Sequence, residues 1–187
     1  PLSKKFFKGD SLKKDILIKG ESFYSDNNID LKTNTEITQV NIKEKYITTH
    51  AGDRYEFSCL VFATGSSSRV FPATTYPGVD IYYLRNIADV NCINNLLKNS
   101  KKPLLIGGGY IGLELAASMQ EMGLSVSIIE QEDRLLKRVT APVMSKFYKD
   151  LHESRGVKIF CDQSIETINK IDNSISYINS SENISSF

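Results

Sequence analysis

Hydrophobic residues are spaced as in short strands in the first half of the chain. From 29 to 65, apolar and polar positions alternate, and Ile37–Ile42 and Tyr46–Thr49 are predicted strands. Ala51–Asp53 is the predicted turn of a hairpin. The apolar run Cys59–Ala63 is typical of a strand buried on both faces. This part of the chain is therefore predicted to hold a small antiparallel β-meander.

Predicted strands and helices alternate regularly in the second half. Thr140 is the predicted N-cap of the last helix, Gly156 ends it, and Val143, Phe147 and Leu151 share one of its faces. This βαβαβ order builds a parallel, doubly wound sheet of the Rossmann type, so the predicted fold class is α/β. The predicted elements are a helix over Ile87–Lys98, a strand over Pro103–Ile106, a helix over Ile111–Met122, a strand over Ser125–Ile129, a helix over Ala141–Arg155 and a strand over Val157–Phe160.

Composition and chain ends narrow the possible organisation. With 187 residues, 41% of them hydrophobic, the chain has apolar material for one domain or two small ones. Residues 70–83 hold two of the five prolines and are the predicted crossover between two domains. The first twenty residues are rich in lysine and are predicted to be a solvated surface. Because the chain starts at Pro1 and stops in a polar run, it is predicted to be a piece of a longer protein.

Charge and cysteine content exclude several classes of protein. The chain has 23 basic and 22 acidic residues, a balance unlike that of a nucleic-acid-binding protein. No apolar run approaches about 18 residues, so no membrane segment is expected. The three cysteines are too far apart for a zinc site or a disulfide framework, so we expect no metal and a cytoplasmic location.

The clearest chemical signal is the glycine-rich segment 107–112, between a predicted strand and a predicted helix. Gly107 permits a tight turn, Gly109 lets a pyrophosphate approach the backbone, and Gly112 allows close packing of helix on strand. The amides at the helix start would hold the phosphates. Glu130 ends the next predicted strand, where an acid binds the adenine ribose hydroxyls and repels a 2′-phosphate. The sequence therefore predicts NADH rather than NADPH as the ligand.

Other charged residues near this segment leave alternatives open. Arg134, Lys137 and Arg138 follow Glu130, and a cation there would suit a 2′-phosphate, or all three are ordinary surface residues. Glu114 lies in the first turn of the predicted helix, where the helix dipole stabilises a carboxylate. On the sequence alone, Glu114 is either a partner of the dipole or a functional residue.

Several motifs occur together over roughly residues 1–160. As a set, they resemble the NADH-dependent ferredoxin reductases, a branch of the FAD-dependent pyridine nucleotide-disulfide oxidoreductases. The resemblance implies that residues 1–78 are the back part of an FAD-binding domain lacking its first dinucleotide-binding loop. It also implies that residues 79–187 are an NADH-binding domain truncated at its C-terminal end. The motifs are Pro1–Lys4, Ala63–Gly65, Tyr83–Arg85, Gly107–Glu114, Arg134–Pro142, and Phe147–Tyr148 with His152 and Gly156–Val157.

The resemblance implies FAD and NADH as cofactors and places residues around them. Lys4 would lie beside the flavin, and Glu114 would pair with Lys4 near the nicotinamide, which makes these two the predicted catalytic residues. No general acid or nucleophile is required, so His50 and His152 are interpreted as structural or exposed. The implied cofactor-binding residues are Lys4, Ile37, Ala63, Thr64, Gly65 and Arg85 on the FAD side, and Gly107, Gly108, Gly109, Tyr110, Ile111, Gly112, Glu114, Glu130 and Arg138 on the NADH side.

The implied activity is electron transfer from NADH through FAD to a two-iron ferredoxin or rubredoxin of an oxygenase system. One alternative is a rubredoxin reductase or NADH oxidase on the same scaffold. Another is a redox-sensing binding protein similar to apoptosis-inducing factor, and a third is an NAD-binding domain without activity of its own. A disulfide-reductase mechanism is disfavoured because Pro1–Lys4 stands where relatives with that mechanism end their redox-cysteine motif. The N-terminal lysines are hypothesised to help dock an acidic ferredoxin.

Overall fold

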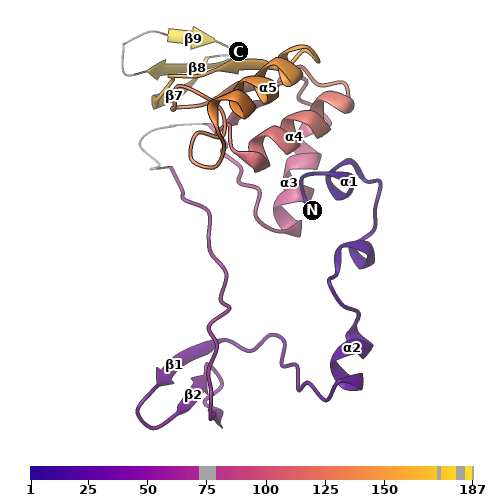
Figure 1. Ribbon diagram of the computed structural model, residues 1–187, viewed down its shortest axis with the longest axis vertical. Coiled ribbons are helices and arrows are strands. Elements are labelled where there is room, and N and C mark those ends of the chain that lie inside the picture. Colours follow the sequence, from indigo (N-terminus) through magenta and orange to yellow (C-terminus); the bar gives the residue numbers. More distant parts are fainter. Residues whose placement is uncertain (72–78, 172–173, 180–183, 187) are drawn as a thin grey trace. The chain divides into compact units, whose positions relative to one another are not determined.

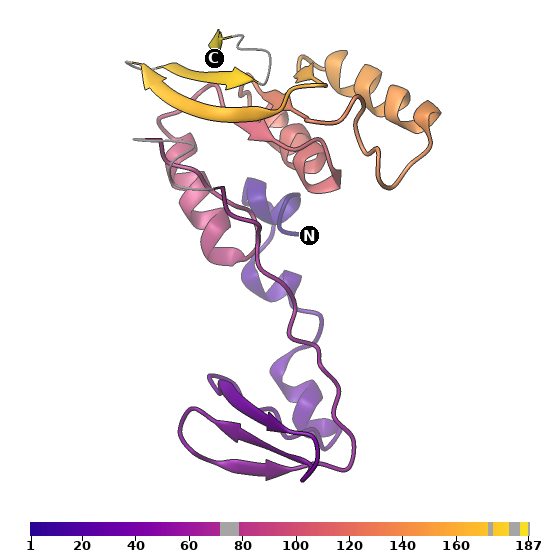
Figure 2. The same ribbon diagram turned by 90° about the vertical axis from the view of Figure 1, so that its left-hand side faces the viewer.

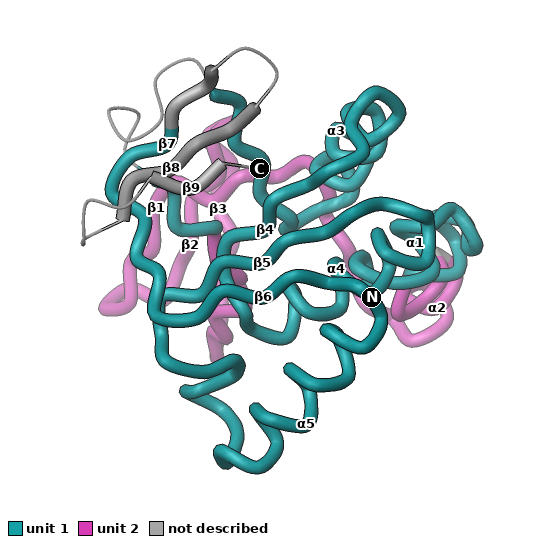
Figure 3. The backbone as a smooth tube through the Cα atoms, turned by 90° about the horizontal axis from the view of Figure 1, so that it is seen from above, with its two compact units in different colours: residues 1–16, 68–187 teal, residues 17–67 magenta. Residues whose placement is uncertain are grey.

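The computed structural model describes residues 1–71, 79–171, 174–179 and 184–186 (Figure 1). The chain forms two compact units, Pro1–Ile16 with Ser68–Phe187 and Leu17–Ser67, coloured separately in Figure 3. The predicted crossover falls largely on 72–78, which lie outside the described residues. No described helix is both long enough and apolar enough to span a membrane.

The first unit is built on three parallel strands, which Figure 3 shows side by side. They are β4 (Leu104–Ile106), β5 (Ser127–Ile129) and β6 (Lys158–Phe160), hydrogen-bonded in that order. Helix α4 (Tyr110–Glu121) connects β4 to β5, and α5 (Pro142–Glu153) connects β5 to β6. The predicted βαβαβ order is therefore confirmed, with element ends shifted by one or two residues.

Strand β5 is buried on both faces. Ile128 is fully buried in the main core with Ala116 and Met119 of α4. The next residue, Ile129, lies in a separate cluster with Ile168 on the other face. Successive side chains of a strand point to opposite faces, and burying each such residue contributes roughly 1.5–3 kcal/mol. This two-sided burial fixes the end of β5, where Glu130 follows.

A second, antiparallel sheet follows the parallel one and was not predicted. It consists of β7 (Ile165–Ile171), β8 (Ser174–Asn179) and β9 (Ile184–Ser186), paired in sequence order and drawn in yellow in Figure 2. Ile168 of β7 is buried in the cluster with Ile129. Strand β7 thus packs against one face of the parallel sheet.

The N-terminal segment packs into the first unit. Helix α1 (Lys5–Lys8) places Phe7, which is fully buried, in the core with Val90 and Ile93. A short 3₁₀ helix, η1 (Lys13–Ile16), follows. Because Phe7 is anchored in the core, the neighbouring residues of the chain start are held against α3 (Ile87–Leu97) and α4. The predicted assignment of residues 1–78 to one domain of a longer protein stays a prediction.

Local side-chain chemistry sets where the helices begin. Helix α3 (Ile87–Leu97) starts with a capping box, in which Asn86 and Asp89 each bond the other's backbone amide. At α5, the prediction of Thr140 as N-cap is wrong: Ala141 occupies that position without a side-chain cap. Pro142 at the first helical position forces the residue before it into an extended conformation. The helix start is therefore set by the proline.

Two apolar residues of helix α5 face outward. Val143 and Phe147 share one face as predicted, but their side chains are 72% and 54% exposed. The buried residues of α5 are Ser145 and His152, both hydrogen-bonded.

The second unit holds α2 (Glu21–Asp26) and an antiparallel sheet. Its strands are β1 (Ile37–Asn41), β2 (Tyr46–Thr49) and β3 (Arg54–Glu56), in that order, which confirms the predicted meander. The predicted strand over Cys59–Ala63 is wrong, since this segment is irregular and Val61 and Phe62 are exposed. A strand buried on both faces needs neighbouring strands and covering layers, and no described strand pairs with this segment.

Candidate dinucleotide-binding site

The glycine-rich segment forms a tight turn between β4 and α4. Gly107 has φ of +109°, a left-handed conformation that favours glycine, and its amide donates to the Ile129 carbonyl oxygen over 2.8 Å. Gly109 is the N-cap of α4. A side chain at Gly112 would collide with the Gly107 carbonyl oxygen, so this position requires glycine. The predicted turn and the predicted close packing are therefore confirmed.

Glu130 fastens this turn to the end of β5. Its Oε2 accepts a hydrogen bond from the Gly108 amide over 2.7 Å, and its Oε1 accepts one from the Glu132 amide over 2.9 Å. The Gly108 carbonyl accepts a further bond from the Leu136 amide. A side chain at Gly108 would collide with Leu135, which is almost fully buried. Gly108 is thus fixed on both its amide and its carbonyl side.

A cavity of about 440 Å³ opens beside the turn. This volume lies in the range of small-molecule sites. A Cβ at Gly109 would meet nothing within 4 Å, so the backbone is open to a ligand there. The first amides of a helix have no intrahelical partner and carry its positive dipole end, which suits an anionic pyrophosphate. The lining includes Gly107, Gly109, Tyr110, Glu130, Lys137 and Arg138.

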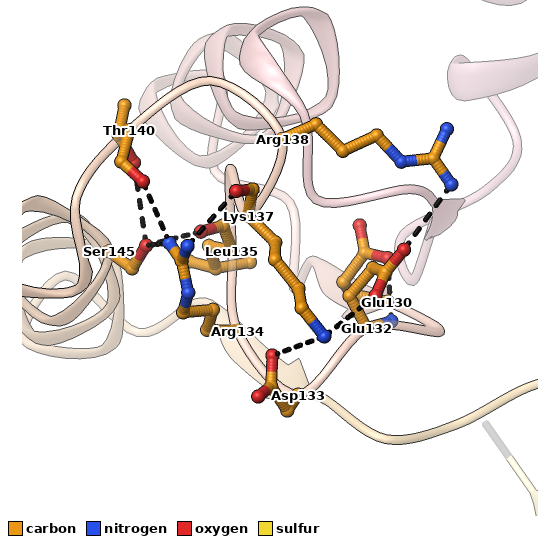
Figure 4. Close-up of polar contacts among 9 residues, drawn as sticks. All are labelled: Glu130, Glu132, Asp133, Arg134, Leu135, Lys137, Arg138, Thr140 and Ser145. Atoms are coloured by element: carbon orange, nitrogen blue, oxygen red, sulfur yellow. Dashed lines mark hydrogen bonds and ion pairs between the residues drawn. The ribbon is translucent and has the colours of Figure 1, made fainter.

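The three cations that follow Glu130 lie on the loop between β5 and α5 and differ in their partners (Figure 4). Arg134 turns away from Glu130: its guanidinium donates to the carbonyls of Lys137 and Thr140, both over 3.0 Å, and to Ser145 Oγ over 2.7 Å. Lys137 and Arg138 instead line the cavity. Of the three, Arg134 is thus used to shape the loop.

Glu132 pairs with both cations that line the cavity. Its Oε2 lies 3.0 Å from Lys137 Nζ, and its Oε1 lies 3.3 Å from Arg138 Nη2. Lys137 and then Arg138 hold the pKa of Glu132 below its ordinary value. Hydrogen bonds to Glu132 and Asp133 raise the pKa of Lys137. Glu132 and Lys137 are therefore both charged at neutral pH.

The N-terminal segment brings Lys4 to Glu114 on α4. Lys4 Nζ lies 3.1 Å from Glu114 Oε1, and Ser3 Oγ donates to Glu114 Oε2 over 2.5 Å. Burial raises the pKa of Glu114, but the bonds from Ser3 and Lys4 together outweigh it and hold the pKa below 4.5. The predicted pairing of Lys4 with Glu114 is confirmed, and Glu114 is ionised at neutral pH.

The remaining FAD-side residues are not among those that line this cavity. Ile37 is an exposed residue of β1, and Ala63, Thr64 and Gly65 are exposed in the irregular segment of the second unit. Arg85 is exposed before α3, and its amide donates to Asp89 Oδ2 over 2.7 Å. Their roles toward FAD stay predictions.

The two histidines have no part in this site. His50 is exposed. His152 is buried, and its Nε2 lies 3.2 Å from the Leu113 carbonyl oxygen. Burial and the charge of Arg155 lower the pKa of His152, so its ring is neutral and donates from Nε2. The interpretation of both as structural or exposed is confirmed.

Two residues that orient the charged side chains of this site were not predicted from the sequence. Ser3 lies within the quoted motif Pro1–Lys4, but no role was assigned to it. Glu132 lies two residues after Glu130 in an irregular loop. Such a loop has no helical or strand periodicity from which the partners of a carboxylate could be predicted. Only its position next to a predicted ribose ligand could have drawn attention to it.

A glycine turn after the first strand of a parallel βαβαβ sheet, with a carboxylate after the second strand, defines a dinucleotide-binding domain. The chain belongs to the pyridine nucleotide-disulphide oxidoreductase family, which matches residues 1–185. Putidaredoxin reductase of Pseudomonas putida is 33% identical over 162 residues, which cover 85% of this chain and 38% of that protein. A rubredoxin–NAD(+) reductase of the same species is 32% identical over 157 residues, which cover 84% of this chain and 41% of that protein.

Solved structures give the same result. A ferredoxin reductase from Rhodopseudomonas palustris has a TM-score of 0.87 at 26% identity, covering 98% of this chain and 46% of that one. The covalent complex of putidaredoxin reductase with putidaredoxin has a TM-score of 0.84 at 28% identity, with the same coverage. The predicted family and fold class are thus confirmed. The family uses FAD with NADH or NADPH, and this chain spans less than half the length of these relatives.

Proposed function

We propose that this chain belongs to an NADH-dependent flavoprotein reductase that passes electrons through FAD to a two-iron ferredoxin of an oxygenase system. The observation that carries the proposal is the Gly107–Gly112 turn, fastened by Glu130 at the mouth of a cavity of about 440 Å³. It occurs in a chain whose relatives include ferredoxin and rubredoxin reductases. Residues 1–78 belong to the FAD side of the full-length protein, and residues 79–187 to the NADH side.

The NADH-side residues bind different parts of the dinucleotide. The amides at the start of α4 hold the pyrophosphate, with Gly109 leaving room for its close approach. Glu130 accepts hydrogen bonds from the adenine ribose hydroxyls. It does so while bonded to Gly108, because a carboxylate offers about four lone-pair sites. Binding the ribose and shaping the turn are thereby linked in one side chain.

Lys4 and Glu114 act on the reaction itself. When bound, NADH supplies a hydride to FAD, which can then release electrons singly. With FAD bound, Lys4 would place a positive charge beside the flavin, where it would stabilise negative charge. Glu114 fixes the Lys4 ammonium from α4, and Ser3 fixes Glu114 in turn. Neither residue has to exchange a proton for this role.

The remaining FAD-side assignments rest on the family resemblance. Ile37, Ala63, Thr64 and Gly65 would contact the FAD dinucleotide, and Arg85 would reach the flavin or pyrophosphate region. A rubredoxin is the alternative acceptor, and rubredoxin reductase or NADH oxidase is the alternative activity.

The test compares electron acceptors for the full-length protein. NADH-dependent reduction is measured with a two-iron ferredoxin, with a rubredoxin and with oxygen, each at matched concentration. Fastest turnover with the ferredoxin is the expected result. Faster reduction of rubredoxin or of oxygen would replace the proposed acceptor by the corresponding alternative. Slow turnover with all three and a long-lived complex after NADH addition would indicate a redox-sensing role.

A further inference from the structure

Two basic side chains line the cavity beside the glycine turn, and neighbouring carboxylates already pair with both of them. Lys137 and Arg138 both line the cavity, and both pair with the single carboxylate of Glu132 (Figure 4). Lys137 has a second partner, Asp133, whose Oδ1 lies 3.1 Å from its ammonium. Asp133 is not among the residues that line the cavity. Glu132 is therefore the carboxylate that links both cations at the ligand side.

These cations lie next to the predicted ribose site. The Glu132 amide donates to Glu130, so the residue that holds the cations is also bonded to the residue expected to bind the ribose. NADPH differs from NADH by a ribose 2′-phosphate, which carries a charge of about −2 at neutral pH. Arginine and lysine are the side chains that accommodate such a phosphate. Lys137 and Arg138 would supply them if they were free.

We propose that Glu132 is a specificity-determining residue, which favours NADH by holding Lys137 and Arg138 away from a 2′-phosphate. The inference rests on the proposed binding of NADH in this cavity. A phosphate that took both cations would leave the Glu132 carboxylate unpaired beside it. Glu132 is 27% exposed, so water compensates this charge only in part. Glu130 and Glu132 thus disfavour NADPH in two ways. Glu130 repels the phosphate directly, and Glu132 keeps Lys137 and Arg138 from pairing with the phosphate.

Glu132→Gln separates these two effects. Glutamine keeps the length of the side chain and the backbone amide that orients Glu130, but removes the charge that holds the cations. Asp133→Asn is the matched control: it removes one negative charge at the neighbouring position, leaves Lys137 paired with Glu132 and does not touch Arg138. A triple variant, Glu132→Gln with Lys137→Gln and Arg138→Gln, removes the liberated cations.

The experiment measures binding of NADH, NADPH and adenosine 2′,5′-bisphosphate to the 187-residue chain by titration calorimetry. We expect Glu132→Gln to bind NADPH and the bisphosphate about tenfold more tightly than the wild type, the scale of one charge-assisted hydrogen bond. NADH affinity should change much less than NADPH affinity, and a far-UV circular dichroism spectrum like that of the wild type shows that the variant is folded. Asp133→Asn should resemble the wild type, and the triple variant should lose the gain.

Two results would overturn the inference while leaving NADH binding intact. One is unchanged NADPH affinity in Glu132→Gln, and the other is an equal gain in Asp133→Asn, which would indicate a general charge effect. If the wild-type chain bound none of the three ligands, the proposed function itself would fail, and this inference with it.

Discussion

The Lys4 ammonium lies 3.1 Å from the carboxylate of Glu114, a residue 110 positions further along the chain. The pair is held from both sides. The Ser3 hydroxyl bonds Glu114, and the buried Ser118 hydroxyl donates to the Ser3 carbonyl oxygen over 2.6 Å. A motif at the start of the chain and the helix after the glycine turn thereby meet in one polar cluster.

Replacing Glu114 tests the Lys4–Glu114 pair, and a second lysine–glutamate pair on the same helix serves as the comparison. Glu121 lies seven residues further along α4 and pairs with Lys8 over 2.9 Å, so Glu121→Gln is a matched control. In the full-length protein, Glu114→Gln should slow reduction of the flavin by NADH by about ten- to a hundredfold, because Lys4 loses the anion that fixes it. Stopped-flow absorbance of the flavin measures this rate. Equal slowing in Glu121→Gln would contradict a specific role for Glu114.

Two neighbouring glycines should respond to alanine in opposite ways. In Gly109→Ala, the new methyl group meets no protein atom within 4 Å, so stability should be kept. NADH affinity should fall by about tenfold or more, because the methyl group occupies space that the pyrophosphate needs. Calorimetric titration with NADH measures this loss.

Gly108→Ala is the counterpart, since its methyl group would collide with buried Leu135. The free energy of unfolding should fall by about 1–3 kcal/mol, as for other overpacked sites. Urea denaturation of both variants measures the contrast. A loss of stability in Gly109→Ala comparable to that in Gly108→Ala would show that the turn is not open at Gly109.

Stability should decline in mild acid because of His152. Burial, with the charge of Arg155, lowers its pKa from 6.5 in the folded chain, so the folded state disfavours the proton that the unfolded state binds. The contribution is complete above pH 6.5 and is lost as the pH falls below it, by at most about 1.4 kcal/mol per pH unit.

The variant His152→Gln isolates this contribution. Its amide can still donate to the Leu113 carbonyl oxygen but does not titrate, so the decline between pH 6.5 and pH 5 should be shallower. Urea denaturation over this range measures the change. His50→Gln, at an exposed position, is the control, and the idea fails if this variant flattens the profile as much.

Arg134 should contribute to stability and Arg138 should not. The Arg134 guanidinium donates to two loop carbonyls and to Ser145, whose hydroxyl in turn bonds the Leu135 carbonyl over 2.6 Å. Arg134→Gln should lower the free energy of unfolding by about 1.5–3 kcal/mol. Arg138→Gln should cause no measurable change, because Arg138 is exposed and pairs with one carboxylate. Thermal and urea denaturation check both, and similar losses would refute the distinction.

Prediction from the sequence worked where local rules and strong periodicity agree. The strands and helices from Leu104 to Phe160 follow from buried apolar runs, helical spacing and glycine punctuation. It failed at Cys59–Ala63, because an apolar run forms a buried strand only where other strands flank it. It also failed at Thr140, where Pro142 outweighed a good capping side chain.

The sequence by itself determined the class of this protein: a Rossmann-type glycine turn, its acid Glu130 and the motifs of a reductase family. These features are local in the sequence, since the glycine turn and Glu130 lie within one βαβ unit and each family motif is a short run of residues. Tertiary structure decided which charged groups meet. It turned Arg134 into the loop and placed Lys137 and Arg138 on Glu132, and it brought Ser3 to Glu114 beside Lys4, whose pairing with Glu114 the family resemblance had implied. Such pairings depend on how distant segments and irregular loops pack, and hydrophobic periodicity carries no information about them.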